Sequence, residues 1–208
     1  MIAAVLRLSR HDCKALKITD PYSIHRVVYS LFGDQRTAEE KLASRSSGIL
    51  YADKGGDFHQ RQILLLSNRN PNPPEYGEVV SKPIPEVFLH HEHYGFEVTV
   101  NPTYRDSASK KLIAVRGREA VMAWFIQRAV SSWGFQVVPE QLQIQQLSVQ
   151  RFDKAGQTLT HGSATLKGAL QVLDRSRFIQ SFEQGIGRGR AFGFGLLQII
   201  PLNNPFEL

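Results

Sequence analysis

Gly185-Ile-Gly-Arg-Gly-Arg-Ala-Phe-Gly-Phe-Gly195 is a segment with five glycines near the C-terminal end of this 208-residue sequence. Glycine adopts positive φ and lets the backbone approach a ligand closely, so consecutive backbone N–H groups can form an anion-binding nest. Arg188 and Arg190 add guanidinium groups, which pair well with phosphate oxygens. The segment therefore indicates a phosphate-binding loop, and a plain tight turn is the structural alternative.

The elements on either side of the glycines argue against a dinucleotide site. Residues 174–183 predict a helix with Asp174 as its N-cap, and residues 192–201 predict a strand. A dinucleotide fingerprint has the opposite order, with a strand before the glycines and a helix after them. We therefore disfavour a nucleotide cofactor and expect the phosphate backbone of a larger polyanion.

The composition favours an acidic partner. The chain has 25 Lys and Arg against 19 Asp and Glu, a net charge of +6, and a sequence pI of about 9.6. Such a balance favours association with polyanions. The single cysteine, Cys13, excludes an intrachain disulfide framework and a cysteine-only zinc site. There is no signal-peptide pattern and no apolar run of roughly 18 residues, so we expect a cytoplasmic protein that does not cross a membrane.

In the first half, one helix is signalled clearly. Asp20 at the N-cap, Pro21 in the first turn and Gly33 past the end are typical of a helix of about three turns. Tyr22, His25 and Tyr29 recur on one face of this helix at three- and four-residue spacings. Strands are expected over 2–8, 48–52 and 61–67, with a polar loop around His11 and Lys17 after the first and an ambiguous segment at 76–85.

In the second half, residues 118–133 predict a helix that Gly134 ends. Val121, Trp124, Phe125 and Val130 lie near its apolar stripe. Phe192 and Phe194 alternate with glycines and are expected to pack inward from the last strand. The remaining β-like segments are 88–89, 96–100, 112–115 and a hairpin of 142–152 with 163–173.

Each half therefore has the order strand, helix, two strands, possible helix and strand, which is the order of the ferredoxin-like βαββαβ unit. We predict an α+β fold of two tandem ferredoxin-like (RRM-like) domains. The first covers residues 1–85, and the second covers residues 86–208 and contains the glycine-rich segment.

Two clusters of polar residues invite functional interpretations. The run from His90 to His93 has two imidazoles on one side of a strand, too few for a convincing metal site, so we expect no metal. The other cluster surrounds a short strand and is basic. It is either a solvated surface or a groove for the backbone of duplex RNA, which proteins recognise mainly by shape and phosphate. Its members are Lys110, Lys111, Arg116 and Arg118.

Four motifs span nearly the whole chain: Asp20-Pro-Tyr22-x-x-His25-Arg26; Val100-Asn101-Pro102-Thr103 with Arg116-x-Arg118-Glu119-Ala; Leu166-x-Gly168-x-Leu170-x-Val172; and Gly185-Ile-Gly187-x-Gly189-x-Ala191-x-Gly193-x-Gly195. In this order they resemble the CRISPR repeat-RNA endoribonuclease family, in the CasE branch that serves the Cascade complex. The sequence departs from the family pattern at Arg188 and Arg190, where small residues or lysine are common.

The resemblance implies two ferredoxin-like domains and an enzyme that acts on CRISPR repeat RNA. Such enzymes bind the stem-loop of the repeat in precursor crRNA and cut at its 3′ base without a metal or other cofactor. The products carry a 5′-hydroxyl and a 2′,3′-cyclic or 3′-phosphate. The expected partners are precursor and mature crRNA and Cascade-type effector subunits. A non-catalytic RNA-hairpin-binding subunit of such a complex is the alternative.

The resemblance also implies site residues. The histidine and tyrosine of the family's first helix match His25 and Tyr22. Histidine suits either proton transfer in attack by the RNA 2′-hydroxyl, because its unperturbed pKa lies close to 6.5. A packed helix-face histidine is the structural alternative. A cation for the phosphate could come from Lys154, His161 or Arg26, and this choice stays open. The RNA-binding residues are expected from their charge and from the glycine-rich segment rather than from the resemblance: Arg26, Lys110, Lys111, Arg116, Arg118, Gly187, Arg188, Gly189 and Arg190.

Overall fold

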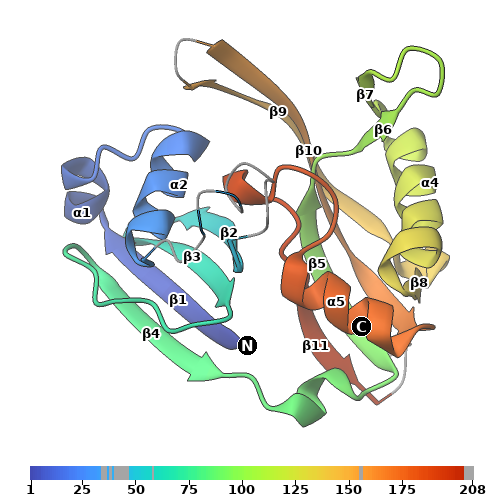
Figure 1. The fold of residues 1–208 in the computed structure, drawn as a ribbon, viewed down its shortest axis with the longest axis horizontal. Helices are drawn as coiled ribbons and strands as arrows, with labels where there is room; N and C mark the ends of the chain where they lie inside the picture. The colour runs from blue at the N-terminus through green and yellow to red at the C-terminus, as the bar shows by residue number, and fades with distance from the viewer. Residues whose placement is uncertain (34–36, 38, 40–46, 58, 155–156, 204–208) are drawn as a thin grey trace. The chain divides into compact units, whose positions relative to one another are not determined.

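The computed structural model divides into two compact units (Figure 1). Unit 1 consists of Met1–Ile84 and Ala191–Gly193, and unit 2 of Pro85–Arg190 and Phe194–Leu208. Three residues of the glycine-rich segment therefore have their contacts in unit 1, although the residues on both sides of them belong to unit 2. The structure describes the whole chain except residues 34–36, 38, 40–46, 58, 155–156 and 204–208.

In the residues that the structure describes, unit 1 has a four-stranded antiparallel sheet and the helices α1 and α2. The strand order is β2-β3-β1-β4, the arrangement of a ferredoxin-like domain. Residues 68–77, between β3 and β4, contain no helix, and α1 and α2 both precede β2. The elements are β1 (Ile2–Ser9), α1 (Arg10–Ala15), α2 (Pro21–Ser30), β2 (Ile49–Gly56), β3 (Gln60–Ser67) and β4 (Glu78–Pro83).

The core of unit 1 lies between α2 and the sheet. Ile24 and Val28 of α2 are buried against alternate residues of the strands, such as Leu6 and Ile63. The helix predicted after Asp20 is confirmed. The loop predicted around His11 is wrong, because α1 occupies it: the Ser9 hydroxyl and the Asp12 carboxylate form a capping box that starts this short helix.

Unit 2 is an antiparallel sheet packed against helices, and its strands have the same ferredoxin-like order as those of unit 1. The path is β11-β5-β10-β8, and β9 also pairs with β10. Together the two sheets confirm the predicted α+β fold of tandem ferredoxin-like domains. The helices and main strands are β5 (His93–Val100), β6 (Thr103–Arg105), β7 (Leu112–Ala114), α4 (Arg118–Arg128), β8 (Phe135–Val137), β9 (Gln143–Lys154), β10 (Gln157–Val172), α5 (Arg175–Gln184) and β11 (Gln198–Leu202).

Aromatic side chains fill the core of unit 2. Phe125 of α4 stacks on Phe96 of β5 with ring centroids 5.7 Å apart, and Phe178 of α5 meets Phe135 edge to face at 6.2 Å. Both helices therefore cover the same face of the sheet. Val130 does not share this burial, contrary to prediction: a five-residue π turn at Ala129–Trp133 rotates it outward, and 48% of its surface is exposed.

Two predicted strands are also corrected. Residues 88–89 lie in a 3₁₀ turn, Glu86–Leu89, which follows Pro85. The last strand begins at Gln198 rather than at residue 192, because glycines at positive φ keep residues 193 and 195 out of extended geometry. The segment before it includes a 3₁₀ turn at Arg190–Phe192.

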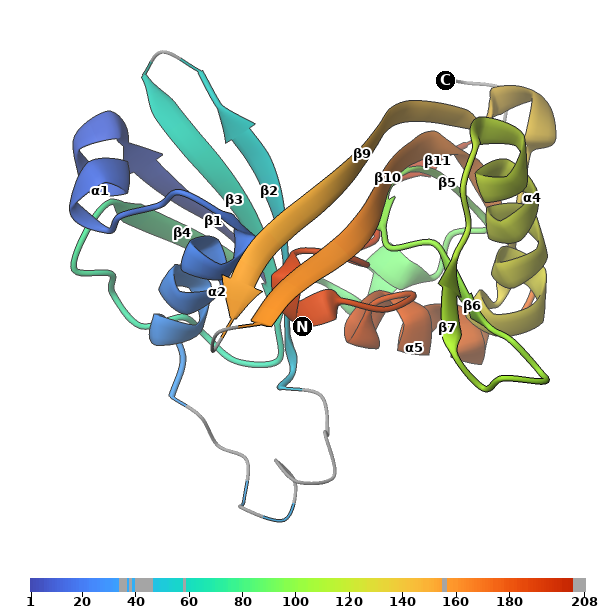
Figure 2. The ribbon, with the colours of Figure 1, turned by 90° about the horizontal axis from the view of Figure 1, so that it is seen from above.

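The β9–β10 hairpin is longer than predicted (Figure 2). β10 pairs with β5 only from Ala164 onward, whereas its pairing with β9 begins at Gln157. Among the described strands, none pairs with the outer part of this hairpin, which is therefore a two-stranded ribbon.

Candidate active site

The tyrosine–histidine motif lies on helix α2, whose N-terminus is fixed by a capping box. The Ser23 N–H donates to the Asp20 carboxylate at 2.7 Å, and the Asp20 N–H donates to the Ser23 hydroxyl at 3.0 Å. This capping box, with Pro21 in the first turn, sets the helical register. Because Ile24 and Val28 face the core, Tyr22 and His25 lie on the neighbouring, half-buried side.

Aromatic rings surround the His25 imidazole. The Tyr22 ring is nearly parallel to it, with centroids 5.8 Å apart and an 18° interplanar angle. The Tyr29 centroid is 4.2 Å away, and that of Phe192 is 5.6 Å away. These contacts restrict the orientation of the imidazole while leaving the residue partly accessible.

The main-chain carbonyl of Ala191 determines which nitrogen of His25 carries hydrogen. His25 Nδ1 lies 2.7 Å from this oxygen, and the Tyr51 hydroxyl donates to the same oxygen at 3.1 Å. A carbonyl can only accept, so Nδ1 must be the donor. In the neutral ring the lone pair is then on Nε2, which is the atom able to take up a proton and return it.

Arg26, the next residue of the motif, lies on the exposed side of α2. Its guanidinium carbon is 5.8 Å from the Tyr22 ring centroid, within the range of a cation–π contact. This contact places a positive charge beside the Tyr22–His25 pair.

The glycine-rich segment is closed at its base by main-chain hydrogen bonds. The Ile186 N–H donates to the Gly195 carbonyl at 2.9 Å, and the Gly195 N–H donates to the Thr99 carbonyl at 2.7 Å. Gly187 has φ +72°, and a side chain there would meet no atom within 4 Å, so its backbone is open on that side. A β bridge joins Arg188 to Asn101.

The two arginines of this segment differ in their contacts. Arg188 is exposed. Arg190 is half-buried, and its Nη1 donates to the Gln184 carbonyl at 2.7 Å, where α5 ends. A cation at a helix C-terminus is favourable, so Arg190 has a structural role whatever it binds in addition. Gly189 is tightly packed, since a side chain there would meet the Phe194 ring at 2.7 Å.

The other two catalytic candidates lie on the β9–β10 hairpin of unit 2. Lys154 is the last residue of β9 and pairs with Gln157. His161 is on β10 opposite Gln150, and its ring centroid lies 5.9 Å from that of Phe194. Burial lowers the pKa of His161. Its imidazole is therefore neutral near pH 7, which makes it a poor source of positive charge.

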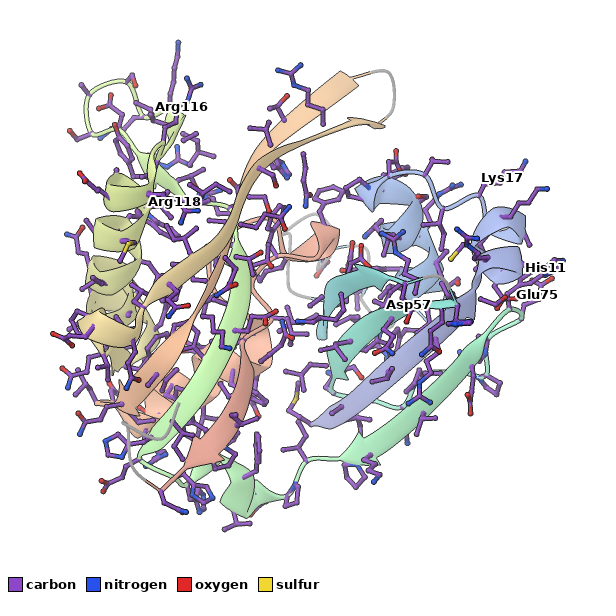
Figure 3. The ribbon with its side chains drawn as sticks, turned by 180° about the vertical axis from the view of Figure 1, so that it is seen from behind. His11, Lys17, Asp57, Glu75, Arg116 and Arg118 are labelled. Atoms are coloured by element: carbon purple, nitrogen blue, oxygen red, sulfur yellow. The ribbon has the colours of Figure 1, made fainter. Side chains whose placement is uncertain are left out.

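The predicted basic cluster divides between a hairpin and a helix start. Lys110 and Lys111 are exposed in the β6–β7 turn, where Lys110 has φ +56°. Figure 3 shows Arg116 and Arg118 at the junction between β7 and α4. Arg118 Nη1 donates to the Ile144 carbonyl at 2.9 Å, so this residue ties α4 to β9, whereas the side chain of Arg116 is exposed.

The histidine run at 90–93 follows the 3₁₀ turn and enters β5. Arg175 donates to the carbonyls of Leu89 and His91, and the His91 ring meets Tyr94 edge to face. Within the described ranges, no group of three or more His, Cys, Asp or Glu side chains is arranged to hold a metal ion.

No helix in the described part of the chain has the length and apolar character needed to span a membrane.

Three residues beside His25 were not anticipated from the sequence. Phe192 was expected to pack inward from a strand, but it lies in the 3₁₀ turn and contacts His25 instead. Ala191 contributes only its main-chain oxygen, which no side-chain pattern reveals. Tyr51 is in the predicted strand of unit 1, and it is separated from Ala191 by 140 positions in the sequence.

Comparison with known proteins finds similarity to CRISPR-associated proteins in both sequence and structure. Residues 3–201 match the profile of the family described as CRISPR associated protein. The CRISPR-associated endoribonuclease Cse3 of Thermus thermophilus is 28% identical over 210 residues, covering 94% of each chain. The structure of Thermus thermophilus Cse3 bound to an RNA representing a pre-cleavage complex has a TM-score of 0.77 at 21% identity, over 96% of this chain and 99% of that one. A chain of a CRISPR RNA-guided surveillance complex has a TM-score of 0.64 at 16% identity, over 97% and 100%.

Proposed function

Because this chain belongs to the CRISPR-associated protein family, which matches it over residues 3–201, we propose that it is an endoribonuclease that processes precursor crRNA. The likeness to Cse3 extends over nearly the full length of both chains and supports this assignment. The substrate is the stem-loop of the CRISPR repeat, cut at the 3′ base of the stem. The observation that carries the proposal is the hydrogen bond from His25 Nδ1 to Ala191, which makes Nε2 the proton-transfer atom.

The chemistry uses the nucleophile that RNA supplies. The 2′-oxygen beside the scissile phosphate attacks phosphorus, and the bond from phosphorus to the 5′-oxygen breaks. Either His25 Nε2 takes the 2′-hydroxyl proton and water protonates the departing 5′-oxygen, or protonated His25 donates to the 5′-oxygen while water takes the 2′-hydroxyl proton. Neither step requires a metal ion. Tyr22, parallel to the imidazole, orients the phosphate through its hydroxyl. The products are a 2′,3′-cyclic phosphate, which hydrolysis converts to a 3′-phosphate, and a 5′-hydroxyl.

We assign the cation that stabilises the pentacoordinate phosphate to Lys154 rather than His161. A lysine ammonium is charged throughout the neutral range. The lowered pKa of His161 leaves its imidazole neutral under the same conditions. Arg26, held over Tyr22, then serves as an RNA-binding residue next to the catalytic pair.

Phosphate contacts along the stem come from exposed cations. We propose Arg188 with the open backbone of Gly187 and the adjoining N–H of Gly189 as one phosphate site, and Lys110 and Lys111 with Arg116 as another. Arg190 and Arg118 support these sites by holding the ends of α5 and α4 in place. The protein acts in the cytoplasm, where it keeps the mature crRNA bound and joins Cascade-type effector subunits.

Incubation with the repeat RNA of its own CRISPR array in EDTA tests the enzyme assignment. The intact protein should cut at one position, and His25→Ala should bind the RNA with near-normal affinity and leave it uncut. Binding by both proteins without cleavage by either would instead support the alternative of a non-catalytic RNA-hairpin subunit.

A further inference from the structure

Tyr51 connects the core of unit 1 to the candidate catalytic histidine. It lies on β2 opposite Leu65, and only 1% of its surface is exposed. Its ring belongs to the hydrophobic cluster under α2. Its hydroxyl donates to Ala191 O at 3.1 Å, the same oxygen that accepts from His25 Nδ1. A buried side chain thus shares one acceptor with His25.

The direction of this hydrogen bond is fixed. A carbonyl oxygen has two lone pairs and no hydrogen, so it can accept from both the phenol and the imidazole. Burial raises the pKa of Tyr51. The phenol therefore keeps its hydrogen at every physiological pH and remains a donor.

Gly193 allows the segment to reach Tyr51. Its φ is +82°, and a Cβ at this position would lie 2.9 Å from Tyr51 Cε2. The segment Ala191–Gly193 therefore rests directly on the tyrosine ring. Contact with the ring and the hydrogen bond to its hydroxyl together determine where the Ala191 carbonyl points.

We propose that Tyr51 is a positioning residue for His25. Its hydroxyl holds the Ala191 carbonyl where it fixes the Nδ1–H tautomer of His25, and this presents Nε2 to the RNA. The inference rests on the proposed function, in which His25 transfers the proton. Tyr51 does not touch the reacting atoms; it acts through Ala191 on the population of the competent tautomer.

Tyr51→Phe tests this role because it removes the hydroxyl and keeps the ring that packs in the core. The first readout is the tautomer of His25, measured by ¹⁵N NMR of the imidazole nitrogens at about pH 8, where an ordinary imidazole is neutral. The second readout is single-turnover cleavage at saturating repeat RNA. We expect the Nδ1–H form to predominate in the wild type and to fall in the variant. Cleavage should slow about tenfold, as expected for one lost hydrogen bond, with Kd changed less than about twofold.

Tyr94→Phe is the matched control. Tyr94 is also fully buried, and its hydroxyl also donates to a main-chain carbonyl, that of Phe88 at 2.7 Å. The control should lose comparable stability without changing the His25 tautomer or the cleavage rate. A tautomer population in Tyr51→Phe equal to that of the wild type would overturn the proposal. The NMR result stands apart from the proposed function, whose failure would appear as a wild-type protein that does not cut or as cleavage by His25→Ala.

Discussion

Gly193→Ala should disrupt the candidate site without altering any catalytic side chain. The added methyl group would lie 2.9 Å from Cε2 of Tyr51, whose ring is fully buried in the core of unit 1. The substitution also places a Cβ on a residue with φ +82°, a conformation that L side chains rarely adopt.

The two effects can be separated in magnitude. A left-handed conformation costs a non-glycine residue about 1–2 kcal/mol. Overpacking against a rigid core costs about 1–3 kcal/mol more. Gly55→Ala is the control for the first effect, because Gly55 has φ +74° in the same unit and a Cβ added there would meet no atom within 4 Å. The difference between the two variants isolates the contact with Tyr51.

Urea unfolding and single-turnover cleavage provide the assay. We expect the free energy of unfolding of Gly193→Ala to be about 1–3 kcal/mol lower than that of Gly55→Ala. Alternatively, the segment Ala191–Gly193 moves off the Tyr51 ring and the clash is relieved. Each 1.4 kcal/mol lowers the ratio of packed to released segment about tenfold, and the cleavage rate falls with it. Equal stability together with equal cleavage rates in the two variants would refute the packing of this segment on Tyr51.

Three further predictions concern single side chains. Tyr22→Phe should slow cleavage about tenfold in single-turnover assays and leave Kd near normal, as expected for one lost hydrogen bond; equal rates would reduce the hydroxyl to a packing role. Arg188→Ala should weaken RNA binding and lower the slope of log K against log salt by about 1, and an unchanged slope would remove it from the phosphate contacts. Because burial lowers the pKa of His161, its contribution to stability is complete above about pH 6.5 and is lost as the pH falls through the folded-state pKa. His161→Gln should therefore flatten the pH dependence of the free energy of unfolding in urea below pH 6.5. A profile identical to that of the wild type would contradict the lowered pKa of His161.

Local signals predicted much of the fold. The Asp20-Pro21 start of α2 follows from capping chemistry, and the alternation of apolar residues in 2–8 follows from a sheet with one buried face. The sequence pattern missed α1, because six residues with no buried side chain carry no apolar stripe. It also extended the last strand too far, since Phe192 and Phe194 alternate as strand residues do while the glycines between and after them adopt positive φ.

For the candidate site, the sequence supports predictions only about the groups that side chains provide. His25 and Tyr22 are marked by their spacing on one helix and by the motif they share with the family. The hydrogen bond that directs His25 goes to a main-chain oxygen 166 positions away in the sequence, and any residue at position 191 would provide that oxygen. Tyr51 has the same burial as its neighbours on β2, so nothing in the sequence separates it from an ordinary core residue.

Cleavage of a repeat RNA with a single 2′-deoxy substitution, at the nucleotide on the 5′ side of the scissile phosphate, tests the central claim most directly. If the RNA supplies its own nucleophile and His25 moves the proton, this RNA should bind with near-normal Kd and remain uncut, while the unmodified RNA yields a cyclic phosphate end. Cleavage of the deoxy-substituted RNA at a comparable rate would contradict the account, because the attacking oxygen would then come from elsewhere.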